Sequence, residues 1–108
     1  MENVISKTHA MIDFETMSTH PNAVVLALGA VAFNSKGISD NKFYINIDRR
    51  DCIVLGLHTL QSTVDWWEKQ SQEAKEALLK EPVVNVLIAM TMFCKWVRET
   101  GCVNVYGN

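Results

Sequence analysis

The chain has 108 residues, of which 48% are hydrophobic and 20% are charged. It is therefore long enough for one ordinary domain, and its composition excludes a disordered chain. Ten Lys and Arg residues against twelve Asp and Glu residues leave a net charge of −2, which excludes a general electrostatic attraction to nucleic acid or to anionic membranes. We predict a single domain over residues 1–108 that meets any nucleic acid through a local site.

Cellular location is indicated by three absences in the sequence. The longest apolar run covers residues 23–33, which is shorter than the roughly 20 residues of a membrane-spanning helix. The first ten residues lack the apolar segment of a secretory signal. The three cysteines, Cys52, Cys94 and Cys102, have no metal-ligand spacing, and their odd number fits a disulfide framework poorly. We predict a cytoplasmic protein with no membrane partner and reduced cysteines.

The N-terminal half is predicted to form three strands. Residues 8–15 alternate between two faces, with Ala10, Ile12 and Phe14 on one and Met11, Asp13 and Glu15 on the other. Residues 24–33 are rich in Val and predict a long buried strand, which enters a hairpin at the turn residues 34–37. The partner strand is predicted over residues 42–48, where apolar and polar side chains alternate again.

Helical signals follow the strands. Residues 49–60 show no periodic pattern, so we predict an irregular segment. Ser62 and Asp65 have the spacing of a capping box, which predicts a helix that carries Trp66 and Trp67. Packing is the expected role of both tryptophans, although one could border a groove.

A second short helix is predicted to begin at Ser71, which can cap it. Within this helix, Glu76 and Lys80 have the i, i+4 spacing of an ion pair. Pro82 is predicted to end it, because proline cannot continue a helix.

The last predicted helix covers residues 85–100. Its apolar stripe consists of Val86, Met90, Phe93 and Val97, and further apolar side chains widen it so far that we expect a largely buried helix. Gly101 can end the helix in the left-handed conformation, and residues 103–106 then predict a strand. Three strands, helices and one strand predict an α/β fold, in which an antiparallel meander is followed by a crossover to a strand parallel to the first.

Asp13 and Glu15 are two carboxylates in an otherwise apolar strand. Residues i and i+2 of a strand share a face, so their backbones lie about 6.6 Å apart. Burying either charge without a partner costs several kcal/mol, so a distant Lys or Arg, solvent or a divalent metal such as Mg²⁺ or Mn²⁺ must offset it. The plainer alternative is that the pair is the polar side of an exposed strand.

Other polar residues have weaker signals. His20 precedes Pro21 in the loop beside the acidic pair, where it could touch a substrate or be an ordinary loop histidine. Arg49 and Arg50 could contact phosphate or simply be solvated.

The segment MIDFETM, followed by PNAVVLALGAVAFN, resembles the first motif and the hairpin of the DnaQ-like, or DEDD, 3′→5′ exonucleases of the ribonuclease H-like superfamily. Residues 63–67, TVDWW, resemble a helix signature of the subfamily that includes prophage exodeoxyribonuclease VIII-like proteins and bacterial exoribonucleases. The resemblance spans most of the chain from His9 to Asn108. It implies a ribonuclease H-like fold.

The resemblance also implies a two-metal hydrolase that removes nucleotides from the 3′ end of DNA or RNA. Asp13 would bind or bridge both Mg²⁺ or Mn²⁺ ions, and Glu15 would bind one and help to orient the attacking water. Thr16 and Met17 stand where the family positions the 3′-terminal nucleotide, through hydroxyl or backbone contact and through apolar packing respectively.

The end of the chain departs from the family pattern. Residues 105–108, VYGN, resemble the approach to the second motif, with Asn108 as its first, substrate-binding residue. Its Asp and the third motif are absent, which predicts the N-terminal portion of an exonuclease domain, inactive alone. The alternative is a non-catalytic nucleic-acid-binding or self-associating prophage remnant. Because residues 103–106 would form an exposed sheet edge, we also predict a homo-oligomer.

Overall fold

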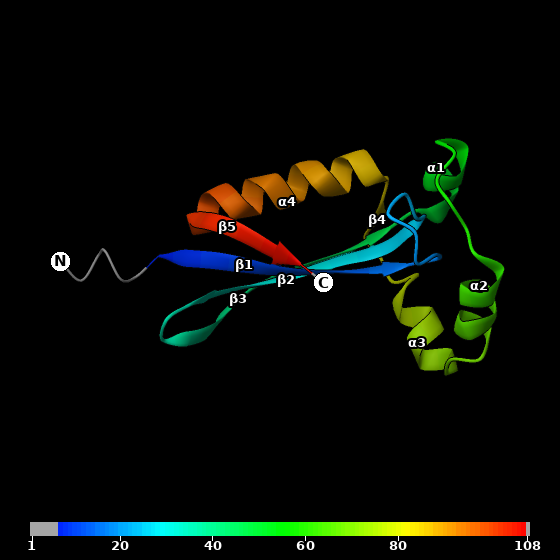
Figure 1. Cartoon of the computed structure of the whole chain (residues 1–108), viewed down its shortest axis with the longest axis horizontal. Helices are drawn as coiled ribbons and strands as arrows, with labels where there is room; N and C mark the ends of the chain where they lie inside the picture. The colour runs from blue at the N-terminus through cyan, green and yellow to red at the C-terminus, as the bar shows by residue number, and fades with distance from the viewer. Residues whose placement is uncertain (1–6, 108) are drawn as a thin grey trace.

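The computed structural model describes residues 7–107, which form a mixed five-stranded sheet with four helices (Figure 1). The strands are β1 (Thr8–Thr16), β2 (Val25–Asn34), β3 (Gly37–Ile47), β4 (Val83–Val84) and β5 (Cys102–Gly107), in the spatial order β4-β3-β2-β1-β5. β1, β2 and β3 are antiparallel neighbours, whereas β5 is parallel to β1. The predicted α/β class, the meander and the parallel crossover are confirmed, and the arrangement is consistent with part of a ribonuclease H-like fold.

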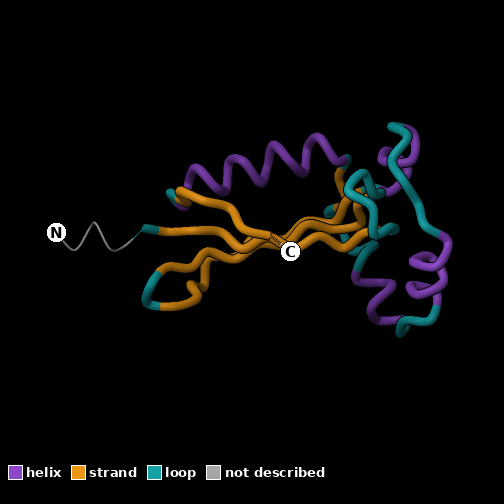
Figure 2. Tube along the Cα trace, in the orientation of Figure 1, coloured by secondary structure: helices purple, strands orange, loops and turns teal. Residues whose placement is uncertain are grey.

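The helices are α1 (Arg49–Val54), α2 (Gln61–Glu68), α3 (Gln72–Ala77) and α4 (Val86–Thr100). Figure 2 shows α4 running along one side of the sheet, whereas α2 and α3 gather on the other side near the end of β1. The two faces of the sheet therefore have different covers, one continuous and one confined to an end. Among residues 7–107, no helix is long and apolar enough to cross a bilayer.

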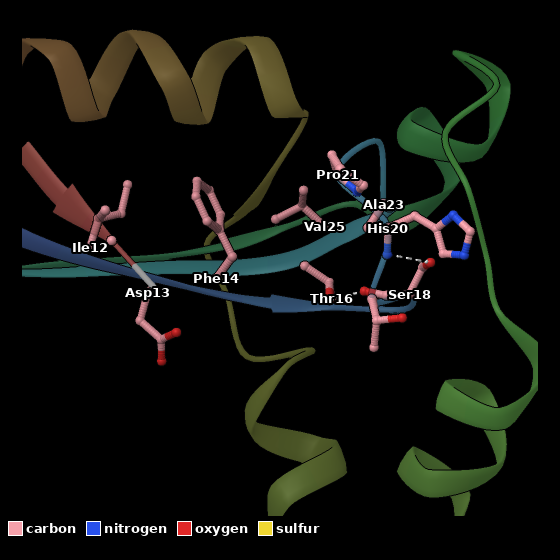
Figure 3. A pocket seen from close by; sticks show the side chains of 11 residues that line it. Ile12, Asp13, Phe14, Thr16, Ser18, His20, Pro21, Ala23 and Val25 are labelled. Atoms are coloured by element: carbon pink, nitrogen blue, oxygen red, sulfur yellow. Dashed lines mark hydrogen bonds between the residues drawn. The ribbon is translucent and has the colours of Figure 1, made fainter.

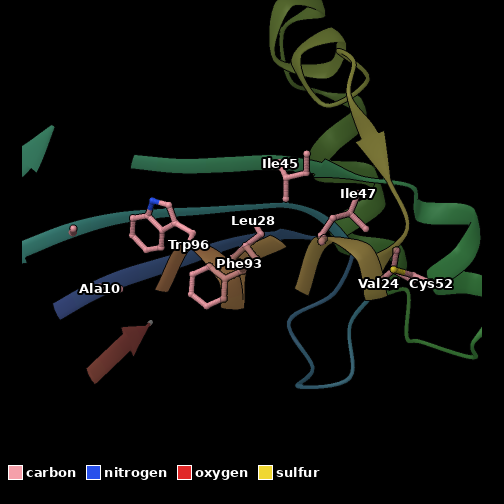
Figure 4. Packing of buried hydrophobic residues seen from close by; sticks show 10 residues of the cluster. Ala10, Val24, Leu28, Ile45, Ile47, Cys52, Phe93 and Trp96 are labelled. Atoms are coloured by element: carbon pink, nitrogen blue, oxygen red, sulfur yellow. The ribbon is translucent and has the colours of Figure 1, made fainter. Parts of the chain in front are cut away.

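The main core lies between the sheet and α4 (Figure 4). Its buried side chains from the sheet are Ala10, Leu28, Ala32, Ile45 and Ile47, and those from α4 are Ala89, Phe93 and Trp96. The ring of Phe93 contacts those of Phe43 and Trp96, with centroids 5.7 and 6.0 Å apart. The indole of Trp96 donates a 3.0 Å hydrogen bond to Asn41 Oδ1, so this large side chain is buried without losing its polar partner.

A smaller core lies on the opposite face, beneath α2 and α3. Leu26, Ala27 and Leu78 are buried there, with Met17 and Trp67 packed against them. Trp67 also donates a 2.9 Å hydrogen bond from Nε1 to the carbonyl of Thr16. This bond ties α2 to the end of β1, where the acidic pair lies.

The start of β3 and the helix α1 differ from the sequence-based prediction. β3 begins at Gly37, five residues before the predicted strand, because Gly37 pairs directly with Asn34 across the hairpin. The irregular segment predicted over residues 49–60 was wrong at its start, where α1 forms. Asp48 explains this helix, because its carboxylate accepts a 2.9 Å hydrogen bond from the amide of Arg50 and caps the first turn.

The predicted capping box of α2 is absent. The helix begins at Gln61, its N-cap residue Leu60 offers no side-chain bond, and Asp65 instead accepts from the side chain of Gln61. The i, i+4 ion pair of α3 is absent too, since the helix ends at Ala77, before Lys80. By contrast Ser71 caps α3 as predicted, by accepting a 3.1 Å bond from the amide of Ala74.

α4 has the predicted ends but not the predicted burial. Asn85 caps its first turn by accepting from the amide of Ile88, and Gly101 ends it with φ of 72°. However, Leu87 and Ile88 are 70% and 48% exposed, so the prediction of a largely buried helix was wrong. The sheet offers α4 only one surface, and an α-helix that packs on one surface leaves its far side open.

Candidate active site

Asp13 and Glu15 project from the face of β1 that is turned away from α4. Figure 3 shows the Asp13 side chain pointing to the opposite side of the strand from Ile12 and Phe14. Asp13 is exposed and Glu15 is half-buried. The predicted placement of both carboxylates on one face is therefore observed in the structure.

Neither carboxylate has a cationic partner within residues 7–107. No hydrogen bond or ion pair links the Asp13 or Glu15 side chain to another described residue. The ion pair found among residues 7–107 joins Arg50 to Asp48 instead. Partial burial, and then the nearby negative charge of Asp13, raise the pKa of Glu15 above its ordinary value. The protein thus gathers two negative charges and leaves them uncompensated by its described side chains.

Acidic, His and Cys side chains do not assemble into a full metal site around this pair. Within residues 7–107, no group of three or more such side chains could hold a metal ion. The structure brings together the two metal ligands that the sequence analysis named, Asp13 and Glu15.

A cavity of about 640 Å³ lies beside Asp13, and Glu15 is not among the residues that line it. β5 pairs with β1 as far as Ile12 and Gly107, and beyond them no strand among residues 7–107 pairs with this edge of β1. The cavity is lined by Asp13, Phe14, Thr16, His20 and Pro21, among other residues (Figure 3). An extended chain can therefore approach Asp13 along this edge.

The loop after β1 is held rigidly beside this cavity. Ser18 is only 3% exposed; its hydroxyl lies 2.6 Å from Nδ1 of His58 and accepts a 3.1 Å bond from the amide of His20. The imidazoles of His20 and His58 stack with centroids 4.1 Å apart. The sequence analysis named His20 and not its partner His58, because 38 residues separate the two in the chain.

The other predicted substrate-contact residues lie in different surroundings. Thr16 lines the cavity, and its hydroxyl donates a 2.6 Å hydrogen bond to the carbonyl of Ser18. Met17 is half-buried and packs against both cores. Asn108 lies outside the described residues.

Two polar residues that sequence reasoning did not name face the acidic pair from β3. Asp13 pairs with Gly29 of β2, which pairs in turn with Tyr44 of β3. Two residues further along β1, Glu15 pairs with Ala27 of β2, and Ala27 pairs in turn with Asn46 of β3. Burial, and then the charge of Glu15, raise the pKa of the Tyr44 phenol, which is thus electrostatically coupled to the acidic pair.

Comparison with known proteins bears on this site. Residues 8–108 match the family described as the 3'-5' exoribonuclease Rv2179c-like domain. The chain belongs to this family. No curated protein and no solved structure matches the chain.

Membership of the Rv2179c-like family confirms the coarser sequence-based prediction, a 3′-5′ exonuclease family, and makes nucleic acid the expected class of substrate. The matched range contains β1 with its acidic pair, the loop with Ser18 and His20, and all four helices. The site described above is therefore part of the exoribonuclease-like domain itself.

Proposed function

We propose that this chain supplies the first acidic motif of a metal-dependent 3′→5′ exoribonuclease of the DEDD type. The observation that carries the proposal is the pair Asp13 and Glu15, two carboxylates on one strand face with no hydrogen bond or ion pair to another described residue. The subfamily of prophage exodeoxyribonuclease VIII-like proteins and bacterial exoribonucleases is the proposed relationship within that type. A cytoplasmic location is proposed as well, because the three cysteines are free.

The donor set fits Mg²⁺ or Mn²⁺. Both ions prefer hard oxygen ligands, and carboxylates held about 6.6 Å apart along a strand can converge on one ion cluster. When bound, such ions stabilise the attacking and leaving oxygens of a displacement at phosphorus. Asp13, which is exposed, and Glu15, which is half-buried, would hold the ions.

The residues of the chain have further roles in this proposal. Trp67, through its bond to the Thr16 carbonyl, fixes the end of β1 and so the direction of the Glu15 side chain. Thr16 lies in the cavity that borders Asp13, where the 3′-terminal nucleotide would lie. The Ser18 hydroxyl holds the loop that forms the cavity's outer wall.

We further propose that residues 7–107 bind RNA without hydrolysing it. Two carboxylates gather at the site, and no group of three potential ligands forms within the described residues. Hydrolysis needs its ligands placed within about 0.5 Å, so additional carboxylates must come from another segment or another copy. Binding of a nucleic acid alone does not need them.

Titration calorimetry with Mn²⁺ tests the metal site. The native chain should bind Mn²⁺, and Asp13→Ala should weaken binding at least about tenfold because one of two ligands is lost. Asp40→Ala is the matched control, since Asp40 is an exposed carboxylate of the hairpin with no described role. Absence of Mn²⁺ binding by the native chain would overturn the metal proposal.

A 5′-labelled RNA single strand tests the predicted inactivity. The chain with Mn²⁺ should leave its length unchanged. Shortening from the 3′ end that Asp13→Ala abolishes would show instead that the chain completes its own site.

A homo-oligomer through the edge of β5 is also proposed. β5 is the outermost strand, and Val103, Val105 and Tyr106 are 56%, 46% and 46% exposed. An open strand edge with apolar flanks favours pairing with another chain. Sedimentation should show a dimer that Val105→Lys dissociates and that Val54→Lys, a change at an exposed residue of α1, leaves intact. A monomer at high concentration would contradict this.

A further inference from the structure

Tyr44 of β3 lies on the same face of the sheet as Asp13, about 10 Å from β1 because two strand spacings separate them. Gly29 of β2, which has no side chain, stands between them in the strand register. A methyl group placed on Gly29 would lie 3.5 Å from Cδ2 of Tyr44, so the tyrosine ring leans over the glycine.

Tyr44 is held in this position by a buried amide. Its hydroxyl donates a 2.9 Å hydrogen bond to Oδ1 of Asn46, which is only 4% exposed. The Asn46 amide nitrogen in turn donates to the carbonyls of Ala77 and Lys80, at 2.8 and 2.9 Å. Tyr44 is nevertheless 58% exposed, so an aromatic ring with a fixed orientation is offered to solvent.

A second cavity, of about 240 Å³, lies beside Tyr44. Tyr44, Asn46, Lys80 and Pro82 line this cavity, together with Glu81 and neighbouring residues of α3 and β3. Lys80 is exposed and forms no ion pair with another described residue. The Glu81 carboxylate instead accepts a 3.0 Å hydrogen bond from the amide of Val83. Lys80 is therefore a cation beside the ring that can contact a phosphate.

We propose that Tyr44 is a stacking platform for a nucleobase of the RNA strand whose 3′ end lies at Asp13 and Glu15, and that Lys80 contacts its phosphate. The proposal rests on the proposed function, because it takes the acidic pair as the place where the 3′ end lies. Every base has a flat face that an exposed aromatic ring can stack on, so such a platform tolerates any sequence, as removal of successive nucleotides requires.

A role for Tyr44 as the general base is less consistent with its surroundings. The burial and the Glu15 charge that raise its pKa keep the phenol protonated at neutral pH. Its proton is also already donated to Asn46. Tyr44 is thus a binding and positioning residue.

Fluorescence of 2-aminopurine tests the platform, since stacking quenches this base. The probe is a single-stranded octaribonucleotide with 2-aminopurine at one of its last three positions, added to the full chain in EDTA, so that the result does not depend on a metal. The native chain should quench at least one position. Tyr44→Ala should abolish the quenching and weaken binding about 5- to 100-fold, the range measured for loss of one stacked base.

Two further variants separate stacking from folding. Tyr44→Phe removes the bond to Asn46 but keeps the ring, so it should quench like the native chain. Trp66→Ala is the control, since Trp66 is an exposed aromatic residue of α2 that does not line the cavity beside Tyr44. Equal quenching in Tyr44→Ala and the native chain, no quenching at any position in the native chain, or equal losses in Tyr44→Ala and Trp66→Ala would each overturn the platform.

The platform and the metal site can fail separately. Tyr44→Ala should retain the Mn²⁺ affinity of the native chain, whereas Asp13→Ala should lose it and still quench 2-aminopurine in EDTA. Loss of Mn²⁺ affinity in Tyr44→Ala would show that the ring supports the acidic pair and would overturn a separate binding role.

Discussion

The two faces of the sheet differ in what the central strands contribute. Toward α4, Leu28 and Ile45 meet Phe93 in a continuous apolar layer. On the opposite face the buried residues gather at one end, beneath α2 and α3, and beyond them Gly29 lies between Asp13 and Tyr44 in the strand register. One face is therefore packed along its length, whereas the other leaves Asp13 and Tyr44 exposed.

This difference shows how one strand can serve both purposes. Successive residues of β1 point to opposite faces, so Ile12 can pack toward α4 while Asp13 stays in solvent. A change at one face should consequently affect stability, and a change at the other should affect ligands more than stability.

Phe93→Ala should lower the free energy of unfolding by about 3 to 5 kcal/mol, because it leaves a cavity in the main core. Phe93 is only 6% exposed and contacts two other aromatic rings. Urea unfolding measures the loss, and Met92→Ala on the exposed side of α4 is the control, with a change of less than about 1 kcal/mol. Similar losses for both variants would contradict the packing described for α4.

Asn46→Ala should lower the free energy of unfolding by about 2 to 3 kcal/mol, although it lies on the ligand face. Its amide serves the carbonyls of Ala77 and Lys80 and the hydroxyl of Tyr44, which would all lose their partner. Asn104→Ala, an exposed amide on β5, should change it by less than about 0.5 kcal/mol in the same urea experiment. If Asn46→Ala lowers the free energy of unfolding no more than its control does, Asn46 does not hold Tyr44 as described.

Ser18→Ala should lower the free energy of unfolding by about 1 to 2 kcal/mol. The buried hydroxyl accepts from the amide of His20 and pairs with His58, so its loss leaves both groups without this partner. Thr19→Ala is the exposed neighbour for comparison. Hydrogen exchange of the His20 amide should quicken in Ser18→Ala, and an unchanged rate would show that the hydroxyl does not hold the loop.

Glu15→Gln should raise the melting temperature by about 2 to 4 °C at pH 7 and not at all below about pH 4, with the effect kept small by solvent screening. The folded state holds the Glu15 proton more tightly than the ordinary value of 4.5 implies, so the stability from this carboxyl is present at low pH and lost as pH rises through the raised pKa. Calorimetry at several pH values measures the difference.

Asp40→Asn is the control for that experiment, because Asp40 is exposed and distant from Asp13 along the hairpin. It should leave the melting temperature within about 1 °C at every pH. A stabilisation by Glu15→Gln that persists below pH 4 would show that burial and the charge of Asp13 do not raise the pKa of Glu15 as described.

Local patterns in the sequence predicted the strands and the acidic pair because each depends on few neighbouring residues. Alternation alone placed Asp13 and Glu15 on one face, and Asn85 and Gly101 marked the ends of α4. Where the prediction was wrong, two local signals competed: Asp48 ended a strand and also capped α1, and Ser62 had the spacing of a cap but lay inside α2.

Periodicity and short motifs are written in consecutive residues, so they were enough to predict the meander with its parallel crossover, a 3′-5′ exonuclease family and the two carboxylates, although they did not predict β4. The groups that surround the acidic pair depend on tertiary packing. Tyr44 lies 31 residues from Asp13 in the chain, and His58 lies 40 residues from Ser18. Strand register and loop packing bring these residues together, and neither can be inferred from the spacing of residues along one chain.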